Sequence, residues 1–158
     1  SLVGVIRGRN RVTLECAASD RELQVRSRQV RNVYETASGR VLLAYMPEPQ
    51  RQAFFQRVGL PDTQIWPGVE KVEALERALA AIRRRKLALS DSPEHVIGLA
   101  VPLWRRGEVV ASVSVYLPQA RFTAARRREI VDALRKAGEE ISRRLAAGSR
   151  ESDDSNRQ

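Results

Sequence analysis

The chain has 158 residues, of which 42% are hydrophobic and 30% charged, and its formal net charge is +9 at pH 7. This length and composition predict one globular domain and exclude disorder over most of the chain, and no apolar run approaches the roughly 20 residues that a membrane span requires. The single cysteine, Cys16, excludes an internal disulfide bond and favours a reducing, cytoplasmic compartment.

The N-terminal part of the sequence predicts a β-hairpin. Apolar and polar residues alternate in Val12–Ala17, and a Gly-Arg-Asn turn separates this segment from a first strand over Leu2–Ile6. A third strand is expected over Leu23–Val30. Ser1 leads directly into the first strand without a signal-peptide pattern, so we expect an excised domain with a further segment upstream.

The middle of the sequence predicts three helices. Ala37–Tyr45 is expected to form a helix with Thr36 or Ser38 as its cap, and Glu48–Val58 is expected to form a second short helix. Val69–Arg85 is amphipathic, with apolar residues three and four positions apart and a basic run at its C-terminal end.

Strands dominate again after the third helix. Leu87–Leu89 predicts a short strand, followed by a loop over Ser90–His95. The segments VIGLAVPL and EVVASVSVYL flank a short turn and predict a hairpin of two nearly buried strands. Consecutive strands and grouped helices predict an α+β fold in which antiparallel pairing dominates.

The last predicted element is an amphipathic helix that starts after Thr123. Gly148 is expected to end it, and the polar residues 148–158 are expected to form a disordered tail. The domain itself is therefore predicted to cover residues 1–147.

The sequence contains no recognisable enzyme motif. His95 is its only histidine, and no metal-ligand spacing accompanies it, so neither a metal nor a cofactor is predicted. TASGR lacks both glycines of the GxSxG pattern, and the phosphate-binding motifs GxGxxG and GxxxxGK[ST] are both absent. We therefore do not expect catalysis.

Four basic clusters leave a nucleic-acid-binding module as the alternative function. They lie at Arg7–Arg11, Arg83–Lys86, Arg126–Arg128 and Arg143–Arg144. Acidic residues are mixed with the helical clusters, and aromatic residues make up only 5% of the chain, so a solvated surface is the favoured interpretation.

One pattern indicates a small-molecule site. TASG opens a helix with small residues, where amide groups and the helix dipole attract an anion. Ser112, Ser114 and Tyr116 share one face of a strand by their spacing of two. One interpretation is that these hydroxyls and the helix start bind a small carboxylate. The other is that the helix start is simply capped and the serines face solvent.

The chain resembles the C-terminal effector-binding domain of IclR-family transcriptional regulators. The resemblance lies in TASGRVLLA, IRRRKLALSD, GLAVPL, VVASVSVYLP and the final helix RFTAARRREIVDALRKAGEEISRRL, in that order. It implies a GAF-like fold, with a mostly antiparallel sheet and helices on both faces. It also implies a small organic or aromatic acid as effector, a homodimer or homotetramer, and DNA binding by a winged helix-turn-helix domain absent from this sequence.

The resemblance also implies which residues face the ligand. They are Ala37, Ser38, Asp91, Gly98, Ser114 and Tyr116. Gly98 stands where the family often has cysteine, and Tyr116 precedes Leu-Pro where Ser-Gly-Pro is common. We expect Tyr116 opposite Gly98 to shape a pocket for an aromatic or longer acid, unless the tyrosine points to solvent. Trp66 and Trp104 are candidates for self-association contacts.

Overall fold

A single six-stranded sheet organises the chain in the computed structural model, which describes residues 2–7, 10–16 and 30–155. The strand order is β3-β2-β1-β6-β5-β4, and every described pair of neighbours is antiparallel. The strands are β1 (Leu2–Arg7), β2 (Asn10–Cys16), β3 (Val30–Asn32), β4 (Ala88–Ser92), β5 (Val96–Arg105) and β6 (Glu108–Pro118).

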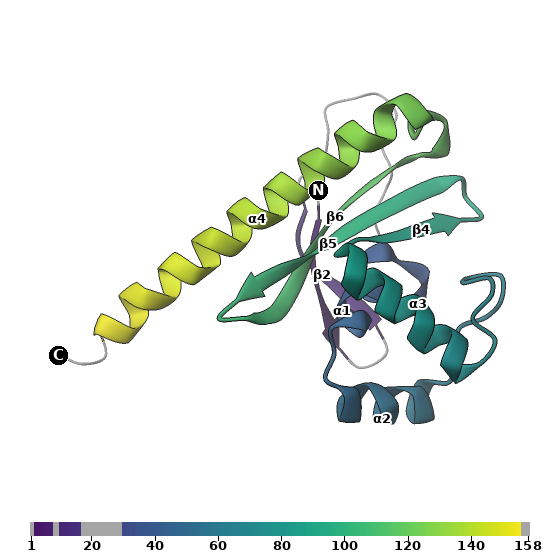
Figure 1. Cartoon of the computed structure of the whole chain (residues 1–158), viewed down its shortest axis with the longest axis horizontal. Helices are drawn as coiled ribbons and strands as arrows, with labels where there is room; N and C mark the ends of the chain where they lie inside the picture. Colours follow the sequence, from purple (N-terminus) through teal and green to yellow (C-terminus); the bar gives the residue numbers. More distant parts are fainter. Residues whose placement is uncertain (1, 8–9, 17–29, 156–158) are drawn as a thin grey trace.

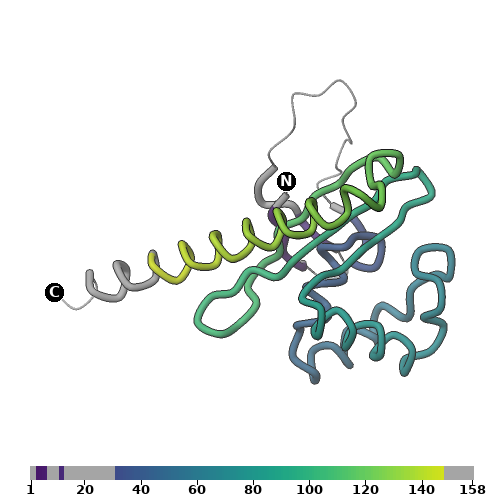
Figure 2. Tube along the Cα trace, turned by 45° about the horizontal axis from the view of Figure 1, so that its top comes forward, coloured from purple at the N-terminus to yellow at the C-terminus, as the bar shows by residue number. Residues whose placement is uncertain are grey.

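Helices cover both faces of this sheet. The helices α1 (Ala37–Ala44), α2 (Glu48–Val58) and α3 (Val72–Arg85) lie on one side, and α4 (Ala124–Ser155) crosses the other diagonally (Figure 1). Figure 2 shows the α1–α3 group and α4 on opposite sides of β5 and β6. This arrangement confirms the α+β class with helices on both faces. Two short 3-10 turns, η1 (Val33–Glu35) and η2 (Gln119–Arg121), complete the described elements.

Two hydrophobic cores result from the alternation of side chains along β5. Leu99 and Val101 pack toward α4 with Leu134, whereas Ala100 packs with α1 and α3. The side chains that face α4 are large and aliphatic, and those that face α1 are small. Because glycine, alanine and serine occupy little height above the sheet, α1 lies close to the strands beneath it.

Gly39 permits a second close approach, between α1 and η1. A Cβ atom at this position would overlap the backbone carbonyl of Val33, and backbone cannot move aside as a flexible side chain can. All eight residues of α1 are buried, so the helix is a core element despite its short length.

Several helices and strands begin or end at other residues than the sequence predicts. The loop predicted over Ser90–His95 is confirmed only for residues 93–95, which form a turn, because β4 continues through Ser92. The third helix begins at Val72 rather than Val69. The helix predicted to end at Gly148 continues to Ser155, and the division into a domain of residues 1–147 and a polar tail stays a prediction.

Two N-terminal predictions are tested only in part. The first two predicted strands are confirmed as β1 and β2. Most of the predicted strand Leu23–Val30 and part of the first turn lie outside the described residues. Within the described residues, no helix combines the length and apolar character that a membrane span needs.

We predict that Gly39→Ala destabilises the fold more than Gly138→Ala does. The added methyl at Gly39 meets backbone, and overpacking of this kind costs about 1–3 kcal/mol. The methyl at Gly138 comes closest to a Val101 side-chain methyl, with its backbone neighbour at an ordinary 3.8 Å, and alanine gains about 1 kcal/mol of helix propensity over glycine. Urea unfolding of the two variants measures the difference. Equal midpoints would contradict the close approach of α1 to η1.

Candidate functional site

Most of the predicted ligand-facing residues come together between the start of α1 and the sheet. Gly98 on β5 pairs with Tyr116 on β6, and Ala100 beside it pairs with Ser114. A Cβ atom at Gly98 would lie 2.8 Å from Cε1 of Tyr116 and also meet the Ser90 hydroxyl that bonds to α1. The Tyr116 ring therefore lies over the α1 face of the sheet, and the alternative in which it points to solvent is wrong.

The amide groups at the start of α1 are more occupied than the sequence pattern suggested. Ala37 N donates to Ser90 Oγ at 3.1 Å, and Gly39 N donates to Thr36 Oγ1 at 3.1 Å. Thr36, rather than Ser38, is therefore the helix cap. An anion at this helix start would meet side-chain groups in addition to whatever amide remains accessible.

Ser90 is the polar residue of β4 that reaches this site, and sequence reasoning missed it. Ala88 and Ser90 are buried on the α1 side of the strand, whereas Asp91 between Ser90 and Ser92 is exposed. Asp91 thus does not join the cluster formed by Ser38, Ser114 and Tyr116, contrary to the expectation. It borders a separate cavity of about 260 Å³ with Glu35. Extending the alternating pattern from Ala88 by two residues would have identified Ser90.

Two hydroxyl groups in the cluster have no hydrogen-bond partner in the described chain. They are Ser38 Oγ and Tyr116 OH, and both atoms are buried. Ser38 as a whole is 1% exposed. A buried polar group without a partner costs about 1–3 kcal/mol, so such groups are uncommon in folded proteins and mark a place where an ordered water or a ligand can bind.

Two arginines give this region a positive potential. Arg40 in α1 donates to the carbonyls of Tyr34, Leu89 and Ile65, and its guanidinium lies 4.1 Å from the centre of the Trp66 ring. Burial lowers the pKa of Arg40 to about 10, and the nearby Tyr116 hydroxyl partly opposes this shift. The guanidinium therefore remains charged at neutral pH.

Arg11 adds a second charge from β2. It is 1% exposed and lies across β1, where its Cδ would be 2.9 Å from a Cβ atom at Gly4. Gly4 pairs with Ser112, so Arg11 lies on the same side of the sheet as the serine row. Burial lowers the pKa of Arg11, while Tyr116 raises it and Arg31 lowers it further. Neither arginine was predicted to contribute, because nothing in the local sequence distinguishes them from surface cations.

The remaining candidates have other positions. His95 is exposed in the turn between β4 and β5, where its Nδ1 lies 3.2 Å from Oε1 of Gln119. No group of three or more potential metal ligands occurs among the described residues. Trp66 packs partly buried against the core, and Trp104 packs edge-on to Tyr45 with ring centres 5.1 Å apart.

Comparisons with known proteins agree with this architecture. The profile of the family described as "Bacterial transcriptional regulator IclR C-terminal" matches residues 2–143. The chain is 35% identical over 109 residues to the probable transcriptional regulator SauR of Cupriavidus necator. The matched segment covers 67% of this chain and 43% of that protein.

Two solved structures are similar over most of the chain. IclR of Thermotoga maritima is 27% identical with a TM-score of 0.77, covering 91% of this chain and 60% of that one. An IclR homolog from Microbacterium hydrocarbonoxydans, complexed with 4-hydroxybenzoate, is 25% identical with a TM-score of 0.75 and covers 91% and 59%.

These findings define the class of protein as a regulatory domain of bacterial transcription factors. The chain belongs to the IclR family, and it corresponds to the C-terminal effector-binding domain of these regulators. It spans less than half the length of the curated relatives that it matches, 43% and 41%.

We predict different effects on stability from removing the hydroxyls of Ser38, at the start of α1, and Ser90, which bonds to it from β4. Ser90→Ala leaves the buried Ala37 amide without its acceptor and should lower the free energy of unfolding by about 1–3 kcal/mol. Ser38→Ala removes a hydroxyl that has no partner, so stability without ligand should be unchanged or higher. Chemical denaturation of both variants provides the measurement. A loss of stability in Ser38→Ala as large as in Ser90→Ala would show that the Ser38 hydroxyl is satisfied within the fold.

Proposed function

We propose that this domain senses a small organic acid, bound between the start of α1 and strands β5 and β6. The effector would control DNA binding by a winged helix-turn-helix domain that is not part of this sequence. The domain would act without catalysis, in the cytoplasm, and as a homodimer or homotetramer. Trp66, on the loop before α3, is a candidate contact in that assembly.

The two unpartnered hydroxyls carry this proposal. Ser38 Oγ and Tyr116 OH can each donate a hydrogen bond, and a carboxylate accepts from both. Ser114 lies one position along the same face of β6 and completes the polar side of the site. Bonds to an ionised acceptor are stronger than neutral ones, so a bound acid would compensate for the cost of burying these groups.

The charge and shape around the hydroxyls support an acid with an apolar body. Arg40 and Arg11 are buried beside Tyr116, and their charges favour an anion over a neutral ligand. The Tyr116 ring forms a flat apolar wall, and it lies directly over Gly98 beside the Ser90 hydroxyl. The 4-hydroxybenzoate bound by the Microbacterium relative is an acid of this kind.

Signalling requires that the acid bind two arrangements of the regulator with different affinity. A ligand changes an equilibrium only by its differential affinity for the two states. A carboxylate that bridges α1 and β6 would favour the arrangement in which these elements lie closest. The DNA-binding domains would respond through the linker and the subunit contacts.

We predict that removing a hydroxyl from the site weakens acid binding without unfolding the domain. A thermal-shift screen of benzoate, 4-hydroxybenzoate and short aliphatic acids should identify a ligand, because saturation at a hundredfold excess over Kd adds about 2.7 kcal/mol of stability. Tyr116→Phe and Ser114→Ala should each weaken that ligand about tenfold, as expected for a lost charge-assisted hydrogen bond of about 1.5–3 kcal/mol.

Tyr45→Phe is the matched control for the tyrosine change. Tyr45 lies at the other end of α1, where its hydroxyl bonds to the carbonyl of Arg83 in α3. Removing this hydroxyl should leave the affinity for the acid unchanged in calorimetry. Equal affinities of Tyr116→Phe and the parent chain would remove Tyr116 from the site. If no acid stabilises the domain, the proposed function is wrong.

We also predict that Gly98→Leu prevents acid binding, because its side chain would occupy the space next to the Tyr116 ring. Tyr116→Ser in the same background removes the ring and should restore part of both stability and binding, a coupling typical of residues in contact. Calorimetry and denaturation of the single and double variants test this. Additive effects would show that the two residues do not share the pocket.

A further inference from the structure

A second cavity lies apart from the proposed effector site, between the C-terminal end of α3, strand β5 and the middle of α4. Its volume is about 630 Å³, which is within the range of about 300–1,000 Å³ typical of small-molecule pockets. We call it the α3–α4 groove. Val101 on its floor belongs to the core that faces α4, whereas Ser38 and Tyr116 lie on the α1 side of the sheet.

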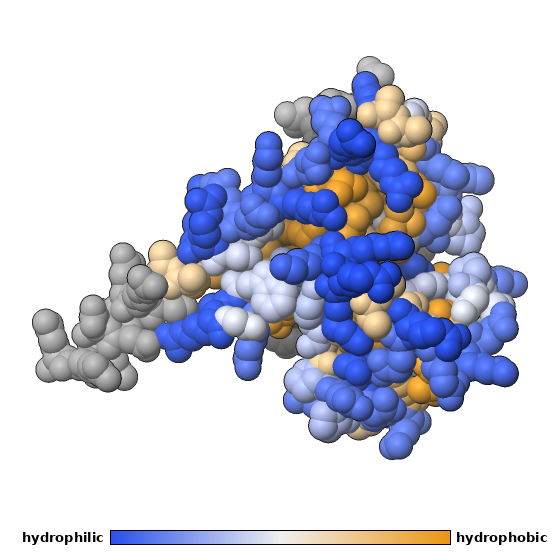
Figure 3. All heavy atoms as spheres, viewed as in Figure 1, coloured by the Kyte–Doolittle hydropathy of each residue, from blue (hydrophilic) through white to orange (hydrophobic). Residues whose placement is uncertain are grey.

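The lining of the α3–α4 groove is strongly basic. Five cations and one carboxylate line it, an excess of four positive charges: Arg84, Arg85, Lys86, Arg135, Arg143 and Glu139. No ion pair joins any of these cations to a carboxylate in the described part of the chain. The space-filling view shows hydrophilic side chains gathered over this region, between α3 and α4 (Figure 3).

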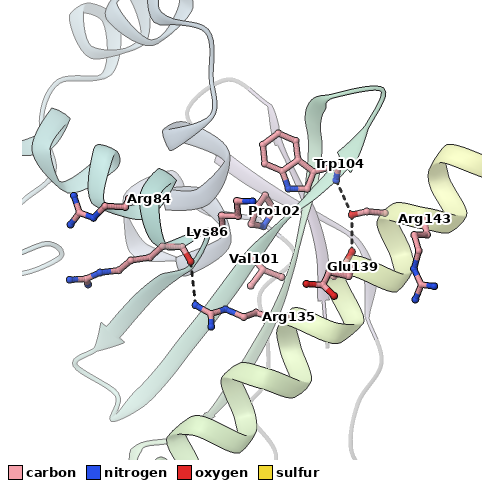
Figure 4. Close-up of a pocket in the computed structure, with 11 residues that line it drawn as sticks. Arg84, Lys86, Val101, Pro102, Trp104, Arg135, Glu139 and Arg143 are labelled. Carbon is pink, nitrogen blue, oxygen red and sulfur yellow. Dashed lines mark hydrogen bonds between the residues drawn. The ribbon is translucent and has the colours of Figure 1, made fainter.

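Lys86 and Arg135 contribute from opposite walls. In Figure 4, Lys86 extends toward Pro102 from the end of α3, and Arg135 extends from α4 toward the end of α3. Arg135 Nη2 donates to the Arg85 carbonyl at 3.3 Å, which closes one end of the groove. Arg84 and Arg143 lie at the rim with their side chains turned outward, so they add long-range attraction rather than direct contacts.

Lys86 occupies this position at a conformational cost. Its φ is +52° and its ψ 34°, the left-handed conformation that ends α3. Glycine or asparagine usually occupies this C-terminal position of a helix, because a side chain with a Cβ atom is disfavoured there. The Lys86 side chain is exposed, and it lies along the groove toward Pro102 (Figure 4).

The floor of the groove is apolar. Pro102 and Val101 form it, and Trp104 stands at its edge, held by a bond from its backbone amide to Ser142 Oγ at 3.0 Å. An indole beside cations suits a ligand with a flat ring and several negative charges. An extended nucleic-acid backbone would need a longer basic surface than this one open groove supplies.

We propose that the α3–α4 groove binds a small aromatic polyanion, such as a nucleoside polyphosphate, with Lys86 and Arg135 contacting its charges. This site is separate from the effector site, and ATP binding is measured on the domain without any organic acid. ATP is the probe, and inorganic tripolyphosphate and a duplex DNA are the comparison ligands. Isothermal calorimetry on this chain gives the affinities.

Lys86→Gly separates the site from a general attraction of anions. The substitution removes the ammonium group from the α3 side of the groove, so ATP should bind about tenfold more weakly. It also places glycine in the left-handed conformation, so the variant should be at least as stable as the parent. Arg106→Gly is the matched control, since Arg106 also has a φ of +52° and does not line the groove. It should change ATP affinity less than about twofold.

A second pair on α4 tests the opposite wall. Arg135→Ala should weaken ATP about tenfold, and Lys136→Ala, which removes the same charge from the adjacent position, should have little effect. The proposal is overturned if ATP does not bind, if variants and controls lose affinity equally, or if tripolyphosphate binds as tightly as ATP. DNA binding that depends on Lys86 and Arg135 without ATP binding would also overturn it, in favour of a nucleic-acid contact. Acid binding at the effector site should be unchanged in all four variants.

Discussion

A buried hydrogen bond fixes the start of α1 to the edge strand of the sheet, and the arrangement of the effector site depends on it. Ala37 N donates to Ser90 Oγ, and Ser90 pairs across the ladder with Gly98, which in turn pairs with Tyr116. Three strands and a helix terminus therefore meet in a single row of residues. Because Gly98 has no side chain, the hydroxyl of Ser90 and the ring of Tyr116 can both lie over it. Any larger residue there would separate the two contacts that define the site.

Arg40 extends the same constraint to the loops. Its guanidinium binds the carbonyls of Tyr34 and Ile65 as well as that of Leu89, so η1, the loop before α3 and β4 are all fixed to α1. These carbonyls lie in irregular or edge positions that lack ladder partners, and a buried arginine satisfies several of them at once. Because the guanidinium is held by these carbonyls, its positive charge stays close to the site. The site thus has a positive potential for the same reason that its loops are ordered.

The sequence predicted the parts of this fold that depend on periodicity. Alternation placed Ser114 and Tyr116 on one face of β6, and the TASG segment placed the helix start correctly. It did not predict Ser90, because a serine and proline segment before a histidine is typical of a loop, and pairing with β5 overrode that local preference. Nor did it identify Arg11, whose burial depends on β2 lying beside a glycine in β1. Contacts between distant segments carry no local signal.

The two faces of β5 divide the molecule into regions with different mechanical roles. Small residues toward α1 let this helix lie close to the sheet, so polar groups of α1, β4 and β6 meet there, whereas Leu99, Val101 and Leu103 toward α4 form a closely packed core. A close-packed core transmits displacement rather than absorbing it. A ligand that draws α1 toward β6 would therefore shift the strands against α4 as a unit. The α3–α4 groove includes Val101 and Gly138 of that same contact, so a polyanion bound there would resist or assist the shift according to which arrangement it fits. The two proposed sites are linked through the packing of one strand.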